Sequence, residues 1–192
     1  MTQESTIQQV DPKSVGVAGA LAIMTLGLMV WGQQGPGFAW DSEATSWIES
    51  TIPGLEMISA WVAWPLATRW PFAAVVLLAA VVLVATKHSR GALALLGAVA
   101  VCSLMYDVLA VVPLEFAPSK ETLFYGAFLG GGALALHKDA TRQTRLIVWF
   151  GAGLLTLVPG LALVSTGQLP SAWLISSCLV ASALAFIHLI MD

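Results

Sequence analysis

The chain has 192 residues, of which 58% are hydrophobic and only 10% are charged. A soluble domain carries about 25% charged residues, so this composition excludes a water-soluble fold. The net charge is −3 and the eight Lys and Arg residues are scattered in short loops, so the sequence offers no basic face for nucleic acid. We therefore expect a single integral membrane domain over residues 1–192.

The first apolar run covers residues 15–32 and is close to the length of about 20 residues that crosses ~30 Å of hydrocarbon. Residues 1–14 before it carry Glu4 and Asp11 against a single lysine, so they lack the positive region of a secretion signal. We expect a short cytoplasmic tail and a retained first helix. The helix should end at the Gly-Pro-Gly turn of residues 35–37.

Residues 38–69 mix acidic side chains with tryptophans, a combination too polar for a membrane span and too aromatic for bulk water. We expect this segment to lie along the outer membrane interface. Asp41-Ser42-Glu43 should cap a short helix that runs to about Glu49. A second short helix over residues 55–64 either stays at the interface or dips into the bilayer.

Five further apolar segments predict membrane-spanning helices. They cover residues 70–86, 91–112, 122–136, 145–164 and 171–190. With the first span they give an all-α bundle of six transmembrane helices. The loops between the later spans are too short to hold a soluble domain.

Orientation follows from Lys and Arg, because short cytoplasmic loops carry an excess of both. If the N-terminus is inside, the inner loops hold six of these cations, Lys13, Lys87, Arg90, Lys138, Arg142 and Arg145. The outer loops then hold only Arg69 and Lys120. This distribution predicts cytoplasmic N- and C-termini, in the inner membrane of a bacterium. Most acidic residues and most tryptophans would then face outward.

Asp107 is the one carboxylate well inside a predicted span, and it follows Tyr106. An intramembrane charge is costly, so it suggests a functional site. The alternative is a structural hydrogen bond to a neighbouring helix, with the carboxyl group protonated by burial. In that case we expect Asp107 to point into the bundle and to be satisfied by Lys120, by a tyrosine or tryptophan, or by water.

Gly126 and Gly130 form a small-residue face that lets another helix approach closely. Packing inside the bundle explains this face as well as a contact with a partner does. The glycines therefore identify no partner.

Three histidines, His88, His137 and His188, fall at the inner ends of predicted helices. Imidazole is the usual axial ligand of haem, so His137 and His188 are candidate ligands for a haem or a chlorin. The alternative is that all three are interfacial polar residues. The sequence lacks HExxH, CxxC and a Gly-rich phosphate loop, so we predict no metal site and no resident cofactor.

Two short strings at the start of predicted outer-to-inner helices resemble motifs of the type-2 phosphatidate phosphatase superfamily. Residues 116–123 read FAPSKETL, similar to that family's Phe-Pro-Ser-Gly-His-Thr-Leu, and residues 167–172 read GQLPSA, similar to its Gly-His-Trp-Pro-Ser-Asp. The matching positions are Pro118, Ser119, Lys120, Glu121, Gln168, Pro170, Ser171 and Ala172. The resemblance implies six helices over residues 15–190 and an outer-facing phosphate site. There the family uses Arg and Lys to hold phosphate, one His as nucleophile and another as acid.

The catalytic residues that the resemblance implies are missing from this sequence. Lys120 and Glu121 stand in place of Gly and His, Gln168 in place of the nucleophile, and Ala172 in place of its orienting Asp. Gln cannot attack phosphorus, and Glu115 with Glu121 would repel a phosphate dianion. The resemblance therefore implies an inactive relative, a pseudoenzyme.

We interpret the chain as a non-catalytic polytopic membrane protein, an accessory or scaffold subunit that packs against membrane lipids and a larger membrane complex. A respiratory or photosynthetic complex would suit as the host, although no residue selects one. The alternatives are a lipid phosphate phosphatase-like enzyme at the outer face and a haem- or pigment-binding subunit. A transporter or lipid-binding module with Asp107 in its path is the third.

Overall fold

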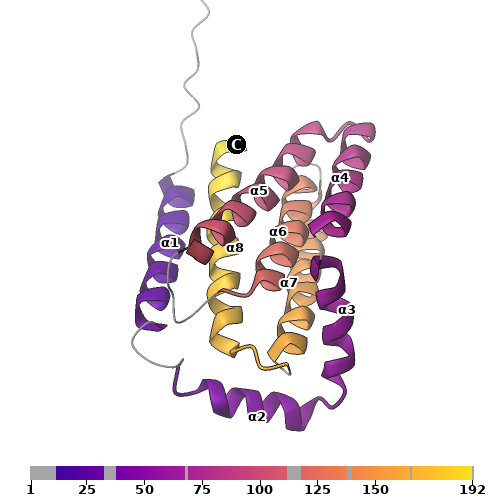
Figure 1. Cartoon of the computed structure of the whole chain (residues 1–192). Coiled ribbons are helices and arrows are strands. Elements are labelled where there is room, and N and C mark those ends of the chain that lie inside the picture. The colour runs from indigo at the N-terminus through magenta and orange to yellow at the C-terminus, as the bar shows by residue number, and fades with distance from the viewer. Residues whose placement is uncertain are drawn as a thin grey trace, which may run out of the picture.

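The computed structural model is all-helical (Figure 1). It describes residues 12–32, 38–67, 69–111, 118–137, 140–164 and 166–191. Within these ranges there is no strand, and the helices are α1 (Pro12–Gly32), α2 (Asp41–Thr51), α3 (Leu55–Ala67), α4 (Arg69–Ala85), α5 (Ser89–Val111), α6 (Lys120–Ala135), α7 (Arg142–Val164) and α8 (Pro170–Met191). The all-α prediction is confirmed.

The centre of the bundle is formed by α5, α6 and α8, which pack against one another. Around them, α1 lies against α8, α4 against α5, and α7 against α6. The main core draws on all three central helices, with Ala98, Leu123 and Ile175 at most 1% exposed. Burial of these apolar side chains holds the central helices together.

The contact between α5 and α6 is close because small residues line it. A Cβ atom on Gly91 would lie 2.8 Å from the Cβ of Ala135 and 3.0 Å from its carbonyl oxygen. A Cβ atom on Gly131 would lie 3.0 Å from the Cβ of Ala98. Any larger residue at these glycines would push the two helices apart.

Three of the helices within the described ranges, α5, α7 and α8, are long and apolar enough to cross a bilayer. A fourth crossing is added if α3 and α4, which bend by 75° at their junction, form one broken span. Of the other predicted spans, α1 supplies the apolar segment Val15–Trp31 and α6 has 16 residues. The long helices are compatible with membrane insertion, while length and composition alone do not establish six spans.

Large apolar side chains cover the outside of the bundle. Ile147 and Phe150 on α7 are 71% and 72% exposed, and Trp70 and Ile190 are each 83% exposed. Soluble monomers rarely show contiguous apolar patches of more than a few hundred Å². Contact with lipid chains would remove the free-energy cost of exposing such a surface to water.

The two ends of the bundle differ in charge. At one end α4 finishes and α5 and α7 begin (Figure 1), and this end, called here the basic end, carries Lys87, Arg90, Arg142 and Arg145. At the opposite end α2 lies across the bundle (Figure 1), and we call it the α2 end.

Helix α3 turns back from the α2 end and packs along α7 before leading into α4. A small apolar cluster of Ile48, Leu55 and Val164 holds α2, α3 and α7 together there. Of the segment expected along the interface, only α2 therefore lies across the bundle, whereas α3 forms part of its side.

Candidate functional site

The two strings that resemble phosphatase motifs meet in space at the N-terminal ends of α6 and α8. The side-chain amide of Gln168 donates to Glu121 Oε2 at 3.2 Å. The backbone N–H of Ser119 donates to Ser176 Oγ at 2.7 Å, and the Ser176 hydroxyl donates to the carbonyl of Ala172 at 2.7 Å. The structure therefore brings together the positions at which the resemblance implies a site.

Ser119 is the N-cap of α6. Its extended backbone, at φ −67° and ψ 117°, lets Ser119 Oγ accept from the N–H of Thr122 at 3.3 Å and from its hydroxyl at 3.0 Å. The Ser119 hydroxyl in turn donates to Glu121 Oε2 at 3.4 Å. Ser119 is 3% exposed and Thr122 is fully buried. The serine of this string thus satisfies helix donors that would otherwise be unpaired.

Lys120 reaches away from this network toward α3. Its ammonium group donates to the carbonyl of Leu66 at 2.7 Å. Leu66 lies in the last turn of α3, where carbonyls have no partner within the helix. Tyr125, also on α6, donates its hydroxyl to the carbonyl of Val62 at 2.8 Å. Together these two side chains tie α6 to the point where α3 breaks into α4.

Asp41 was expected to cap its own helix, and that expectation is wrong. Asp41 is 3% exposed, and the N-cap of α2 is Trp40, whose side chain makes no capping bond. The carboxylate binds the start of α8 instead. Its Oδ1 accepts the N–H of Ser171 at 2.8 Å, and its Oδ2 accepts the Ser171 hydroxyl at 2.5 Å. The same oxygen accepts the N–H of Phe38 at 2.9 Å.

This role of Asp41 could not be found in the sequence, because Asp41 and Ser171 are 130 residues apart. The sequence does signal that α8 starts at Pro170 and leaves an unpaired N–H at Ser171. A carboxylate is a favourable partner there, since it also interacts with the positive end of the helix dipole. Only the folded chain shows which acid supplies it.

Asp107 does not point into the bundle, so that prediction is wrong: its side chain is exposed on α5. The proposed partner Lys120 donates to the carbonyl of Leu66 instead. Ala98, which lies in the core, is nine residues earlier, so Asp107 is turned about 180° from it around the helix. Tyr106 packs against the core, with its ring 6.3 Å from that of Phe124.

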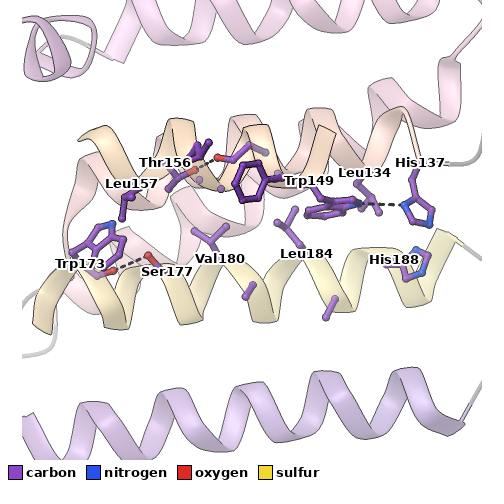
Figure 2. A pocket seen from close by; sticks show the side chains of 18 residues that line it. Leu134, His137, Trp149, Thr156, Leu157, Trp173, Ser177, Val180, Leu184 and His188 are labelled. Atoms are coloured by element: carbon purple, nitrogen blue, oxygen red, sulfur yellow. Dashed lines mark hydrogen bonds between the residues drawn. The ribbon is translucent and has the colours of Figure 1, made fainter. Parts of the chain in front are cut away.

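A cavity of about 760 Å³ opens between α7 and α8, with α6 behind it (Figure 2). Its volume falls within the range of about 300–1,000 Å³ that is typical of ligand pockets. Gly126 and Gly130 lie on the α6 side, where their missing side chains let α8 pack closely. A Cβ atom on Gly126 would lie 3.0 Å from Val180 Cγ2, and one on Gly130 would clash with Leu184.

The histidines considered as haem ligands line this cavity at the basic end (Figure 2). The ring centroids of His137 and His188 are 5.6 Å apart, and the indole N–H of Trp149 donates to His137 Nδ1 at 3.2 Å. Throughout the part of the chain that the structure describes, no group of three or more His, Cys, Asp and Glu residues could hold a metal ion.

Trp173 lines the same cavity toward the α2 end. Its indole lies against Gly160 of α7, where a Cβ atom would collide with the ring. Among the described residues, its buried N–H has no hydrogen-bond partner. The cavity is thus apolar along its length, with imidazoles near one end and an indole near the other.

Comparisons with known proteins do not place the chain in a family. No protein-family model matches it. Neither a curated protein nor a solved structure matches it.

Proposed function

We propose that this chain is a non-catalytic integral membrane protein, an accessory or scaffold subunit of a membrane assembly. The observation that supports it is how the polar groups of the two phosphatase-like strings are used. Gln168 binds Glu121, and Lys120 binds the carbonyl of Leu66. Ser171 binds Asp41. These bonds hold helices together at the positions where the resemblance implies catalytic residues.

The electrostatics of the α2 end support the same proposal. The N-terminus of a helix is a favourable place for an anion, and it would be the natural site for a substrate phosphate. At α8 this place is taken by the carboxylate of Asp41, and at α6 by the Ser119 hydroxyl. Glu121 adds a second negative charge beside them. A phosphate dianion would meet two carboxylates at this site.

The face of α1 that points away from α8 supports the proposal of a protein partner. Gly16, Gly19 and Gly27 have no atom within 4 Å of the position where a Cβ would stand. Small residues on a lipid-facing helix let a second helix approach closely. A transmembrane helix of another subunit is the partner that this face would suit.

The proposed orientation has the basic end in the cytoplasm of a bacterium and the α2 end outside. It is supported by the gathering of Lys87, Arg90, Arg142 and Arg145 at one end, because short cytoplasmic loops are enriched in Lys and Arg. The exposed Trp47 and Trp61, on α2 and α3, would then belong to the aromatic belt of the outer interface.

The proposal is tested by assay of the purified protein with phosphatidate and with a polyprenyl diphosphate. Phosphate release should not exceed the rate without protein, because Gln168 is not a nucleophile for phosphorus and the Glu121 carboxylate bonded to its amide would repel a phosphate dianion. Turnover that disappears with Glu121→Gln would show that the α2 end is a working active site and would overturn the proposal.

A further inference from the structure

The 760 Å³ cavity adjoins a second pocket of about 340 Å³ at the basic end. The two share three lining residues, Leu134, His137 and His188. Whereas the first is apolar along most of its length, the second is lined by Lys87 and His88 of the turn between α4 and α5 and by Arg90 at the start of α5. We call this second space the basic pocket.

The chemistry of the basic pocket suits an anion. Lys87 and Arg90 contribute positive charges, and three imidazoles, those of His88, His137 and His188, contribute polar nitrogens. None of the described residues that line it is acidic. Arg and Lys are the side chains that hold phosphate groups in proteins.

The backbone between α4 and α5 places Lys87 in the turn that lines this pocket. Two backbone hydrogen bonds close the end of helix α4. The N–H of His88 donates to the carbonyl of Leu83 at 2.8 Å, and the N–H of Lys87 donates to the carbonyl of Val84 at 3.0 Å. This is the Schellman arrangement, in which glycine usually takes the left-handed position. Here Lys87 occupies it, with φ +66°. The turn therefore carries a cation at a place where glycine would fit with less steric cost.

We propose that the two spaces together bind one anionic phospholipid of the membrane, with its phosphate in the basic pocket and an acyl chain in the cavity between α7 and α8. The proposal rests on the membrane location given under the proposed function. It does not depend on the absence of catalysis or on a protein partner.

The length of the cavity supports an acyl chain as its occupant. Along α8 its lining residues run from Trp173 to His188, which is about 22 Å at 1.5 Å per residue. One leaflet covers half of the ~30 Å hydrocarbon core, so this length accommodates an extended chain. Basic pockets between transmembrane helices on the cytoplasmic side are also known to bind phosphate headgroups.

A haem or chlorin is the competing occupant. The rings of His137 and His188 meet edge to face, with 67° between their planes. A macrocycle ligated by both imidazoles does not fit between rings in this contact. The charged groups of the basic pocket would bind the phosphate of a phospholipid. The long apolar cavity matches the shape of an acyl chain better than that of a flat macrocycle.

The experiment is native mass spectrometry of the delipidated full chain in detergent, titrated with phosphatidylglycerol or with phosphatidylcholine of the same acyl chains. A parallel titration uses inorganic phosphate. We expect one phosphatidylglycerol to bind more tightly than phosphatidylcholine, and phosphate alone to bind far more weakly. Equal binding of the two lipids, or phosphate binding as tightly as phosphatidylglycerol, would overturn the proposal.

Two pairs of variants locate the site. Lys87→Gln with Arg90→Gln should weaken phosphatidylglycerol binding by about 30-fold, the loss expected when two cations stop contributing to an anionic lipid. Arg142→Gln, at the same end but outside the pocket lining, should leave it unchanged.

The second pair of variants tests the site of the acyl chain. Gly153 lines the cavity and has open space at its Cβ position, so Gly153→Leu should fill the cavity and weaken lipid binding. Gly151→Leu is the matched control, because Gly151 also faces open space but does not line the cavity. Unchanged lipid binding in Gly153→Leu would overturn the proposal.

A visible absorption band in the protein purified from native membranes, lost in Gly153→Leu, would assign the cavity to a pigment and overturn the proposal. Release of the protein from membranes by alkaline carbonate would contradict the proposed membrane function itself. A protein that stays in the membrane but shows no preference for phosphatidylglycerol contradicts only the lipid site.

Discussion

At the scale of single residues, Asp41 joins the start of α2 to the start of α8 through two hydrogen bonds from Ser171, and it accepts a third from the N–H of Phe38 just before α2. Asp41→Asn removes the charge and turns an N–H₂ group toward donors that need an acceptor. Because a hydrogen bond to a charged group contributes about 1.5–3 kcal/mol, we expect the free energy of unfolding to fall by about that amount. Thermal unfolding in detergent, followed by circular dichroism, measures the change. Glu43→Gln, at an exposed position on the same helix, is the control and should have no effect.

Asp107 gives a second prediction at this scale. Its side chain is exposed, so Asp107→Asn and Asp107→Leu should both leave the folded yield unchanged. The yield of monodisperse protein after size-exclusion chromatography in detergent is the measurement. A lower yield for Leu together with a normal yield for Asn would show that the carboxyl group has a hydrogen-bonding role inside the bundle after all.

The sequence identifies which residue types lie at a helix start but not which residues meet there. Pro118-Ser119 and Pro170-Ser171 were expected at the beginnings of two helices, and α6 and α8 do begin there. Local rules for helix starts are enough to predict this. The pairing of Gln168 with Glu121 depends on how α6 and α8 pack. No local pattern encodes that packing.

At the scale of elements, the apolar runs predict the later helices within three residues of their ends. The predicted spans 91–112 and 145–164 correspond to Ser89–Val111 and Arg142–Val164. Continuous apolar composition and the breaks at Gly and Pro carry this information. The position of α3 was left open between the membrane interface and a dip into the bilayer, because residues 55–64 are apolar and aromatic enough for either. In the structure α3 packs against α7 along the side of the bundle, which the sequence did not indicate.

The exposed glycines of α1 give the prediction at the scale of elements. Gly16→Leu with Gly27→Leu should leave the bundle folded, because both positions face open space. The same change should block a close approach by another transmembrane helix. We expect a stoichiometric partner to co-purify with the native protein from its own membranes in mild detergent and to be lost from this variant.

Gly151→Leu on α7 is the control for this experiment, because Gly151 also has open space at its Cβ position. It should keep the partner. A protein that purifies alone under every mild condition would contradict the accessory role, and a partner retained by the α1 variant would show that the contact lies elsewhere.

At the scale of the whole molecule, the two ends should face opposite sides of the membrane. In a background with Cys102→Ala and Cys178→Ala, we expect Arg142→Cys to be labelled only from the cytoplasm and Glu43→Cys only from outside. Both positions are exposed, at the basic end and on α2 respectively. A membrane-impermeant thiol reagent applied to intact cells and to inverted vesicles makes the measurement. The reverse pattern would place the basic pocket in the outer leaflet.

The link between Asp41 and Ser171 can form only late in synthesis of the chain. Ribosomes add roughly 5–20 residues per second, so the 130 residues between the two positions take roughly 6–26 s to make. During that time the carboxylate of Asp41 lacks two of its three donors, and α1 lacks α8, the helix it packs against. Helix α1, which leaves the ribosome first, therefore meets α8 only after the last helix has been made. A nascent chain stalled before residue 170 should expose α1 to any neighbouring membrane helix.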